Sequence, residues 1–120
     1  VRTGDFLFSR ANTSELVGAV AIADNVPAGL LLPDKIWRIE WNANRMTPQF
    51  AYSLLRSAEI RRVFAVIGSG TSGSMKNISQ AKLVRVPIPL PPLRIQIAFS
   101  EQASRLEAVA RQLDDAGAKA

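Results

Sequence analysis

The fold of this chain depends on residues 63–96, VFAVIGSGTSGSMKNISQAKLVRVPIPLPPLRIQ. The apolar run Val63–Ile67 precedes the glycines of residues 68–73, GSGTSG, which have the spacing of a dinucleotide-binding turn. Such a turn requires a preceding strand and, about 20 residues further on, an acidic side chain that binds the ribose. No Asp or Glu occurs between Glu59 and Glu101, so the acidic partner is missing.

Two further features argue against a nucleotide site. Four prolines, Pro87, Pro89, Pro91 and Pro92, prevent a second parallel strand from following a full crossover helix. A phosphate-binding loop needs lysine directly after its last glycine, but Ser74 stands there and Lys76 follows two positions late. A dinucleotide-binding fragment stays open as an alternative, and it predicts a strand at Val63–Ile67.

The preferred interpretation of the same stretch is a helix. Apolar side chains at Ile60, Val63, Phe64 and Ile67 have helical spacing, which predicts a helix from Ser57 to Ile67. Gly68 would be its C-cap in a left-handed conformation, because glycine adopts that conformation without a Cβ clash. The glycine-serine run then becomes a surface loop.

Upstream, three short strands are expected. Alternation of apolar and polar side chains favours a strand with one buried face, so Trp37 and Trp41 are assigned to the core, with stacking on bases as the alternative. Gly18 allows a bulge or close packing. The strands are expected at Phe6–Phe8, Leu16–Ile22 and Lys35–Trp41.

Capping residues predict the shorter helices. Thr47 before Pro48 marks a helix start, and Ser79 marks a short helix that ends at Leu83. Residues 83–88 can form a further strand at a sheet edge, and residues 87–92 favour an extended connector. The expected fold is α+β, with a small mixed sheet, packed helices and one long C-terminal amphipathic helix.

The C-terminal segment repeats apolar residues at alternating four- and three-residue steps from Leu93, and Gln102 fills one missing position. This heptad pattern predicts a helix that packs lengthwise against another helix, although a helix folded back on its own domain is the alternative. Gly117 is expected to end it. The side chains of the expected assembly seam are Ile95, Phe99, Leu106, Val109 and Leu113.

Composition excludes several kinds of chemistry. The 120 residues have 48% apolar content, include neither cysteine nor histidine and suffice for at most one domain. Disulfides, thiolate chemistry and the commonest general base and metal ligand are therefore excluded. The apolar runs are too short to span a membrane. Catalysis by this chain is not expected, and neither a cofactor nor a metal is assigned to it.

The net charge of +5 is unevenly distributed. Residues 60–100 hold six basic side chains and no acidic one, whereas the charges of residues 1–59 cancel. Such a patch attracts a polyanion such as double-stranded DNA, although a solvated basic face without a ligand fits the charge equally well. The candidate phosphate contacts are Arg61, Arg62, Lys76, Lys82 and Arg85.

Polar loops flank this patch and offer groups for base or backbone contacts. An ordinary hairpin connection is the alternative for the first loop. The candidate residues are Arg10, Asn12, Thr13, Ser69, Thr71, Ser72, Ser74 and Asn77.

Three motifs in this order resemble the specificity subunit of type I restriction-modification enzymes. Residues 4–8, GDFLF, resemble the family's Gly-Asp-apolar-Leu strand, and residues 70–83 resemble its glycine loop followed by Asn-Ile-Ser and leucine. Residues 88–96, IPLPPLRIQ, resemble its Pro-Leu-Pro-Pro-Leu-x-Glu-Gln hinge, with Ile95 where that pattern has glutamate.

The resemblance implies a non-catalytic, cytoplasmic subunit that reads one half of a bipartite DNA target. It assigns residues 1–90 to a target recognition domain that looks shortened at its N-terminus. It assigns residues 91–116 to a proline hinge with a spacer helix, and residues 117–120 to a tail. Implied partners are methyltransferase subunits, which would bind S-adenosylmethionine themselves, and motor-nuclease subunits. Whether the helix pairs with a copy of itself stays open, and a purely structural module that self-associates through its C-terminal helix is the alternative function.

Overall fold

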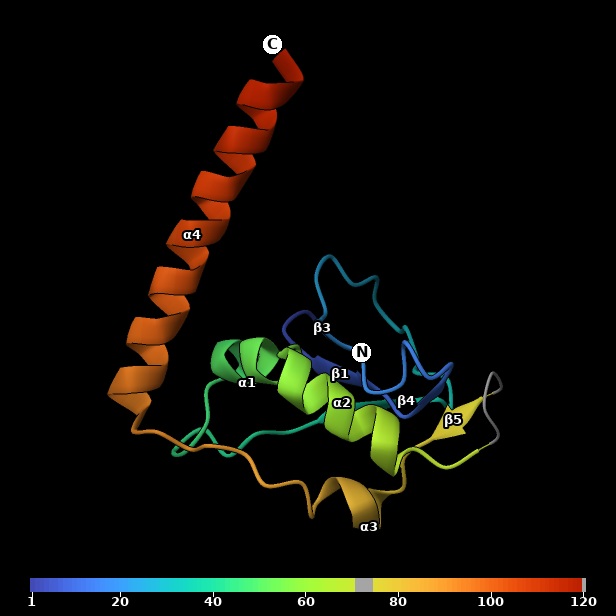
Figure 1. Ribbon diagram of the computed structural model, residues 1–120. Helices are drawn as coiled ribbons and strands as arrows, with labels where there is room; N and C mark the ends of the chain where they lie inside the picture. Colours follow the sequence, from blue (N-terminus) through green and yellow to red (C-terminus); the bar gives the residue numbers. More distant parts are fainter. Residues whose placement is uncertain (71–74, 120) are drawn as a thin grey trace.

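The computed structural model describes residues 1–70 and 75–119, and it confirms the predicted α+β class. Two small antiparallel sheets and three short helices form a globular body, from which one long helix projects (Figure 1). The strands are β1 (Phe6–Ser9), β2 (Ala11–Asn12), β3 (Val20–Ile22), β4 (Ile36–Ile39) and β5 (Lys76–Asn77). The helices are α1 (Pro48–Leu55), α2 (Ala58–Ile67), α3 (Gln80–Leu83) and α4 (Leu93–Lys119).

The larger sheet has the order β3-β1-β4, and its central strand contributes two aromatic side chains to the core. Phe6 and Phe8 are buried on the same face of β1, as expected for alternate residues of a strand. The ring of Phe8 stacks on Trp37 of β4 at 6.1 Å between centroids, and Phe6 meets Trp41 edge-on at 5.3 Å. Both tryptophans are partly buried and pack against the core, at its edge and not inside it. Every described strand pair is antiparallel, so the expected mixed sheet is wrong in this respect.

The second predicted strand is shorter than expected because a turn occupies its first half. The N–H of Val17 donates to the carbonyl of Thr13 (2.8 Å), and Gly18 has a φ of 82°. A Cβ on Gly18 would lie 2.4 Å from Cδ2 of Phe64, so the predicted close packing at this glycine is confirmed. The strand β3 is therefore limited to Val20–Ile22, which forms the ladder with β1.

Helix α1 starts where its predicted cap places it, and α2 starts one residue after the predicted first residue, Ser57, which serves as its cap. The Thr47 hydroxyl accepts from the N–H of Phe50 (3.1 Å), and the Ser57 hydroxyl accepts from the N–H of Ile60 (3.4 Å). Because α2 runs to Ile67, the strand that a dinucleotide-binding turn needs is absent from this described segment, and that alternative is wrong.

The C-cap of α2 differs from the prediction. Gly68 is extended, with a φ of −65° and a ψ of 132°, instead of left-handed. The chain leaves the helix directly into a bridge in which Ser69 and Asn77 exchange two backbone hydrogen bonds of 2.8 and 2.9 Å. The extended backbone of Gly68 directs the chain into this bridge.

The segment after α3 is irregular. Ser79 caps α3 as predicted, through a hydrogen bond from the N–H of Lys82 (3.2 Å). The strand expected at residues 83–88 is wrong, because Leu83 ends α3 and the following residues form no ladder. Pro87 lacks the N–H that such a ladder needs. Val86 and Ile88 nevertheless pack against the core.

The first turns of α4 lie on α1, and the rest extends away from the globular body (Figure 1). Phe99 meets Phe50 of α1 edge-on, with 5.7 Å between ring centroids. Further along, Leu106 and Leu113 are 64% and 68% exposed. The predicted stop at Gly117 is wrong, since α4 continues to Lys119. In the described part of the chain, no helix combines the length and apolar character needed to cross a membrane.

Candidate nucleic-acid interface

The small β2–β5 sheet joins two loops that lie far apart in the sequence. Ala11 pairs with Asn77, and Asn12 pairs with Lys76. The N–H of Ile78 also donates to the carbonyl of Arg10 (2.8 Å). We call the combined surface, made of residues 10–13, 69–70 and 75–77, the paired loops.

Buried residues hold the paired loops on the core. Ala11 of β2 and Ile78, which directly follows β5, are 4% and 1% exposed, so an apolar group anchors the small sheet on each side. Gly70, with a φ of 141°, approaches the carbonyl of Met75 so closely that a Cβ would lie 2.4 Å from its oxygen. The paired loops therefore present polar side chains from a backbone that is anchored on the core at Ala11 and Ile78.

Arg10 is held by neighbours on two sides. Its Nη2 donates to the Asp34 carboxylate at 2.6 Å, and its Nε donates to the Asp34 carbonyl at 2.8 Å. The guanidinium also lies over the ring of Trp37, 5.7 Å from the centroid. These contacts fix the direction of a cation at the edge of the paired loops.

The other described polar residues of the paired loops bond locally. Asn12 donates to the Ser9 hydroxyl (3.4 Å) and accepts from the N–H of Thr13 (2.9 Å). The Ser69 hydroxyl donates to the carbonyl of Asn77 (3.3 Å). The side chains of Thr13 and Asn77 are exposed. Thr71, Ser72 and Ser74 lie outside the described residues.

The two candidate lysines bond to backbone carbonyls and keep further donors. Lys76 Nζ donates to Gly70 (3.0 Å), and Lys82 Nζ donates to Ile67 (3.4 Å) at the C-terminal end of α2. An ammonium group has three N–H donors, so each can bind a phosphate oxygen as well. In the described part of the chain, only Arg10 and Arg38 form ion pairs with carboxylates.

The five predicted phosphate contacts do not all gather at one place. Lys76 belongs to the paired loops, whereas Lys82 and Arg85 line a hollow with Ile67 beside the end of α2. Arg61 turns towards the body: its guanidinium donates to the carbonyl of Val17 (2.9 Å) and to that of Glu15. Arg62 is exposed on α2. The structure thus brings together the polar loops and divides the basic residues.

This arrangement can be compared with known proteins. Residues 2–115 match the family described as type I restriction modification DNA specificity domain. The chain belongs to this family.

Two specificity subunits are similar in sequence. The type I restriction enzyme MjaX specificity subunit of Methanocaldococcus jannaschii is 34% identical over 93 residues, which is 78% of this chain and 22% of that protein. The type I restriction enzyme EcoEI specificity subunit of Escherichia coli is 30% identical over 97 residues, 81% of this chain and 16% of that protein. The chain therefore spans about a fifth of the length of these relatives.

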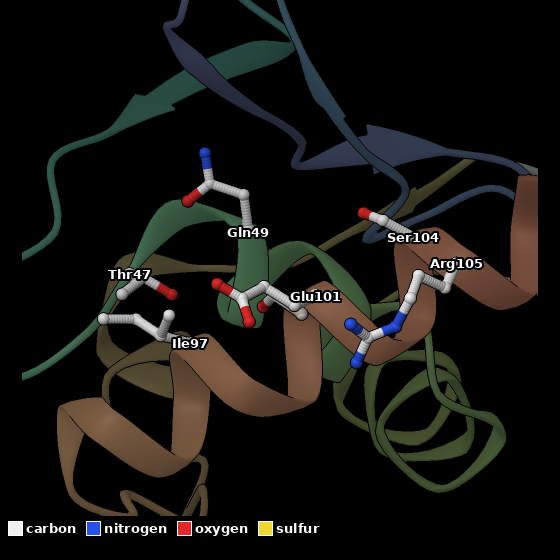
Figure 2. Close-up of a pocket in the computed structure, with 7 residues that line it drawn as sticks. Thr47, Gln49, Ile97, Glu101, Ser104 and Arg105 are labelled. Carbon is white, nitrogen blue, oxygen red and sulfur yellow. The ribbon is translucent and has the colours of Figure 1, made fainter.

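A second surface of this specificity-family chain lies between α1 and α4. An open groove of about 460 Å³ is lined there by side chains from both helices (Figure 2). Glu101 and Arg105 come from α4, and Gln49 comes from α1. The lining residues are Thr47, Gln49, Ile97, Ser100, Glu101, Ser104 and Arg105.

One residue of the hinge motif was assigned no role from the sequence. Gln96 is fully buried, and it is the only polar or charged residue so classed among those the structure describes. A glutamine within an amphipathic helix is ordinarily expected at the surface. Its place in the first turn after the proline hinge is the available signal, but two of its partners, Arg45 and Thr47, are about 50 positions away in the sequence.

Proposed function

We propose that this chain reads one half of a bipartite DNA target within a type I specificity subunit. The observation that supports the proposal is the β2–β5 pairing, which joins two polar loops into one surface with Lys76 inside it. The chain's membership of the specificity family supports the same assignment. Exposed Thr13 and Asn77 are the described candidates for base or backbone contacts, and Lys76 contributes a phosphate contact.

Further phosphate contacts come from the basic residues beside the paired loops. Arg62, Lys82 and Arg85 are exposed and extend the positive surface around α2 and α3. Arg10 supplies a guanidinium, held by Asp34, at the edge of the paired loops. Arg61 acts mainly through the turn that it holds, because two backbone carbonyls already accept from its guanidinium.

The assembly role belongs to residues 91–116. Methyltransferase subunits dock along α4, where the seam side chains remain 48–68% exposed. These subunits bind S-adenosylmethionine and transfer the methyl group, and motor-nuclease subunits cleave. The chain itself is non-catalytic in this scheme, in line with a sequence that has neither histidine nor cysteine.

A titration of duplex DNA at several salt concentrations tests the recognition surface. Each phosphate contact contributes about one unit to the slope of log K against log salt. Lys76→Ala and Lys82→Ala should each lower this slope by about one unit, whereas Arg111→Ala on distal α4 should leave it unchanged. An unchanged slope for a lysine variant removes that lysine from the interface.

A structural module that self-associates through α4 is the second candidate, favoured by the exposed seam. It predicts a concentration-dependent dimer without DNA affinity. A DNA shift assay with the unmodified chain separates the two functions.

A further inference from the structure

The buried side chain of Gln96 connects the starts of two helices. Its Oε1 accepts from the N–H of Thr47 at 2.8 Å. Its Nε2 donates to the carbonyl of Arg45 at 2.7 Å and to that of Pro91 at 2.9 Å. Both amide hydrogens and one oxygen lone pair therefore take part in hydrogen bonds. If the amide were flipped, its NH₂ group would face the N–H of Thr47, and its oxygen would face two carbonyl oxygens. The amide has one orientation in this site.

These bonds complete the cap of α1 from another helix. In a capping box, the N-cap hydroxyl accepts from the third helical residue, whose Glu or Gln side chain accepts from the N-cap N–H. Here Thr47 is the N-cap and Phe50 the third helical residue, which cannot return that bond. Gln96 of α4 supplies the missing acceptor, and Phe50 packs on Phe99 instead.

The proline hinge before α4 forms few other hydrogen bonds. Pro91 and Pro92 lack N–H groups, and the carbonyl of Pro92 accepts the first bonds of α4 from Ile95 and Gln96, at 2.9 and 3.1 Å. Beyond Phe99 the seam side chains are at least half exposed. The direction of α4 is thus set within its first two turns.

The geometry points to Gln96 as a positioning residue that locks α4 in one direction relative to the globular body. The amide of Gln96 joins residues 45–47, the proline hinge and α4 at one buried point, and the Phe50–Phe99 contact restricts rotation beside it. The consequence for function rests on the proposed role: a fixed α4 sets the distance from the paired loops to whatever binds the distal helix.

Distance measurements between two spin labels test this lock. The chain has no cysteine, so Glu59→Cys on α2 and Arg111→Cys on α4 provide unique labelling sites in exposed positions. Labelled chain is diluted into excess unlabelled chain, so that contacts between copies do not contribute. The lock predicts a single narrow distance distribution in the parent, and a broad or shifted one with Gln96→Leu.

Gln80→Leu is the matched control, because it makes the same change at an exposed position that lies on neither the seam nor the proline hinge. It should keep the parent distribution. An unchanged narrow distribution with Gln96→Leu overturns the proposal. If circular dichroism shows that Gln96→Leu is unfolded, Gln96→Glu decides. This variant keeps the acceptor for Thr47 and loses at least one of the two donors, since a carboxyl group has at most one O–H. Broadening therefore supports the lock, and an unchanged distribution overturns it.

DNA titration of the same variants keeps this inference distinct from the proposed function. The hydrogen bonds of Gln96 go to Arg45, Thr47 and Pro91, outside the paired loops. Gln96→Leu should therefore alter the spin-label distances while retaining the parent's DNA affinity. If the parent chain fails to bind DNA, the proposed function fails, and the distance distributions still decide whether Gln96 fixes α4.

Discussion

At Gly18 the backbone lies close to a core aromatic ring. A Cβ there would lie 2.4 Å from Phe64, and the φ of 82° strains any L side chain. Gly18→Ala should therefore lower the free energy of unfolding by about 2–4 kcal/mol, from left-handed strain plus overpacking. Urea unfolding measures the loss. Gly29 has a φ of 80° with nothing within 4 Å, so Gly29→Ala shows the strain alone. Equal losses in both variants would rule out the contact with Phe64.

Arg61 and Arg62 are neighbours with different surroundings, which allows a matched comparison. Arg61 donates to the carbonyls of Glu15 and Val17, whereas Arg62 is exposed. Arg61→Met should destabilise the chain by about 1–3 kcal/mol, because hydrogen bonds from a charged donor are lost. Arg62→Met should leave stability nearly unchanged and lower the salt slope of DNA binding by about one unit. Thermal unfolding and DNA titration of both variants check the two halves of this prediction, and the reverse pattern would contradict it.

At the scale of elements, local signals predicted the helices well. Thr47, Ser57 and Ser79 each cap a helix through a bond three residues away, so a short window of sequence contains both partners. The β2–β5 sheet was not predicted, because each strand has two residues and the pairing spans 65 positions or so. For the same reason the sequence supplied the polar loop residues as candidates but not their pairing. The role of Gln96 was not predicted, because Arg45 and Thr47, to which its side chain bonds, lie at the start of another helix.

The exposed seam of α4 makes a prediction about assembly. Leu106 is 64% exposed, so its substitution should change the stability of the isolated chain little. In a lengthwise helix pair, however, its side chain would be buried. Leu106→Glu should weaken self-association at least tenfold, since a carboxylate would then be buried without a partner. Sedimentation velocity over a range of concentrations measures the change. Ala108→Glu, which adds the same charge off the seam, should have a much smaller effect. Equal weakening by both variants would indicate charge repulsion instead of seam packing.

Across the whole molecule, the structure separates a compact body from a helix that extends beyond it (Figure 1). Phe8 and Phe64 are fully buried in the body, whereas Val109 and Leu113 of α4 are 51% and 68% exposed. Local opening is easiest where few apolar contacts must break. In a dilute solution of the chain, the backbone amides of β1 and α2 should therefore exchange slowly with deuterium. The amides of distal α4 should exchange quickly.

The same exchange measurement tests whether DNA binds at the paired loops while distal α4 stays available to a helical partner. Added duplex DNA should slow exchange in the paired loops, because phosphate and base contacts would restrict the β2–β5 strands. Distal α4 should stay fast until a helical partner or a second copy covers the seam. A high-salt sample provides the control, since it releases the DNA while leaving the fold intact. Protection by DNA that begins in distal α4, with unchanged exchange at residues 10–13 and 75–77, would place the nucleic acid along the helix and contradict the proposed interface.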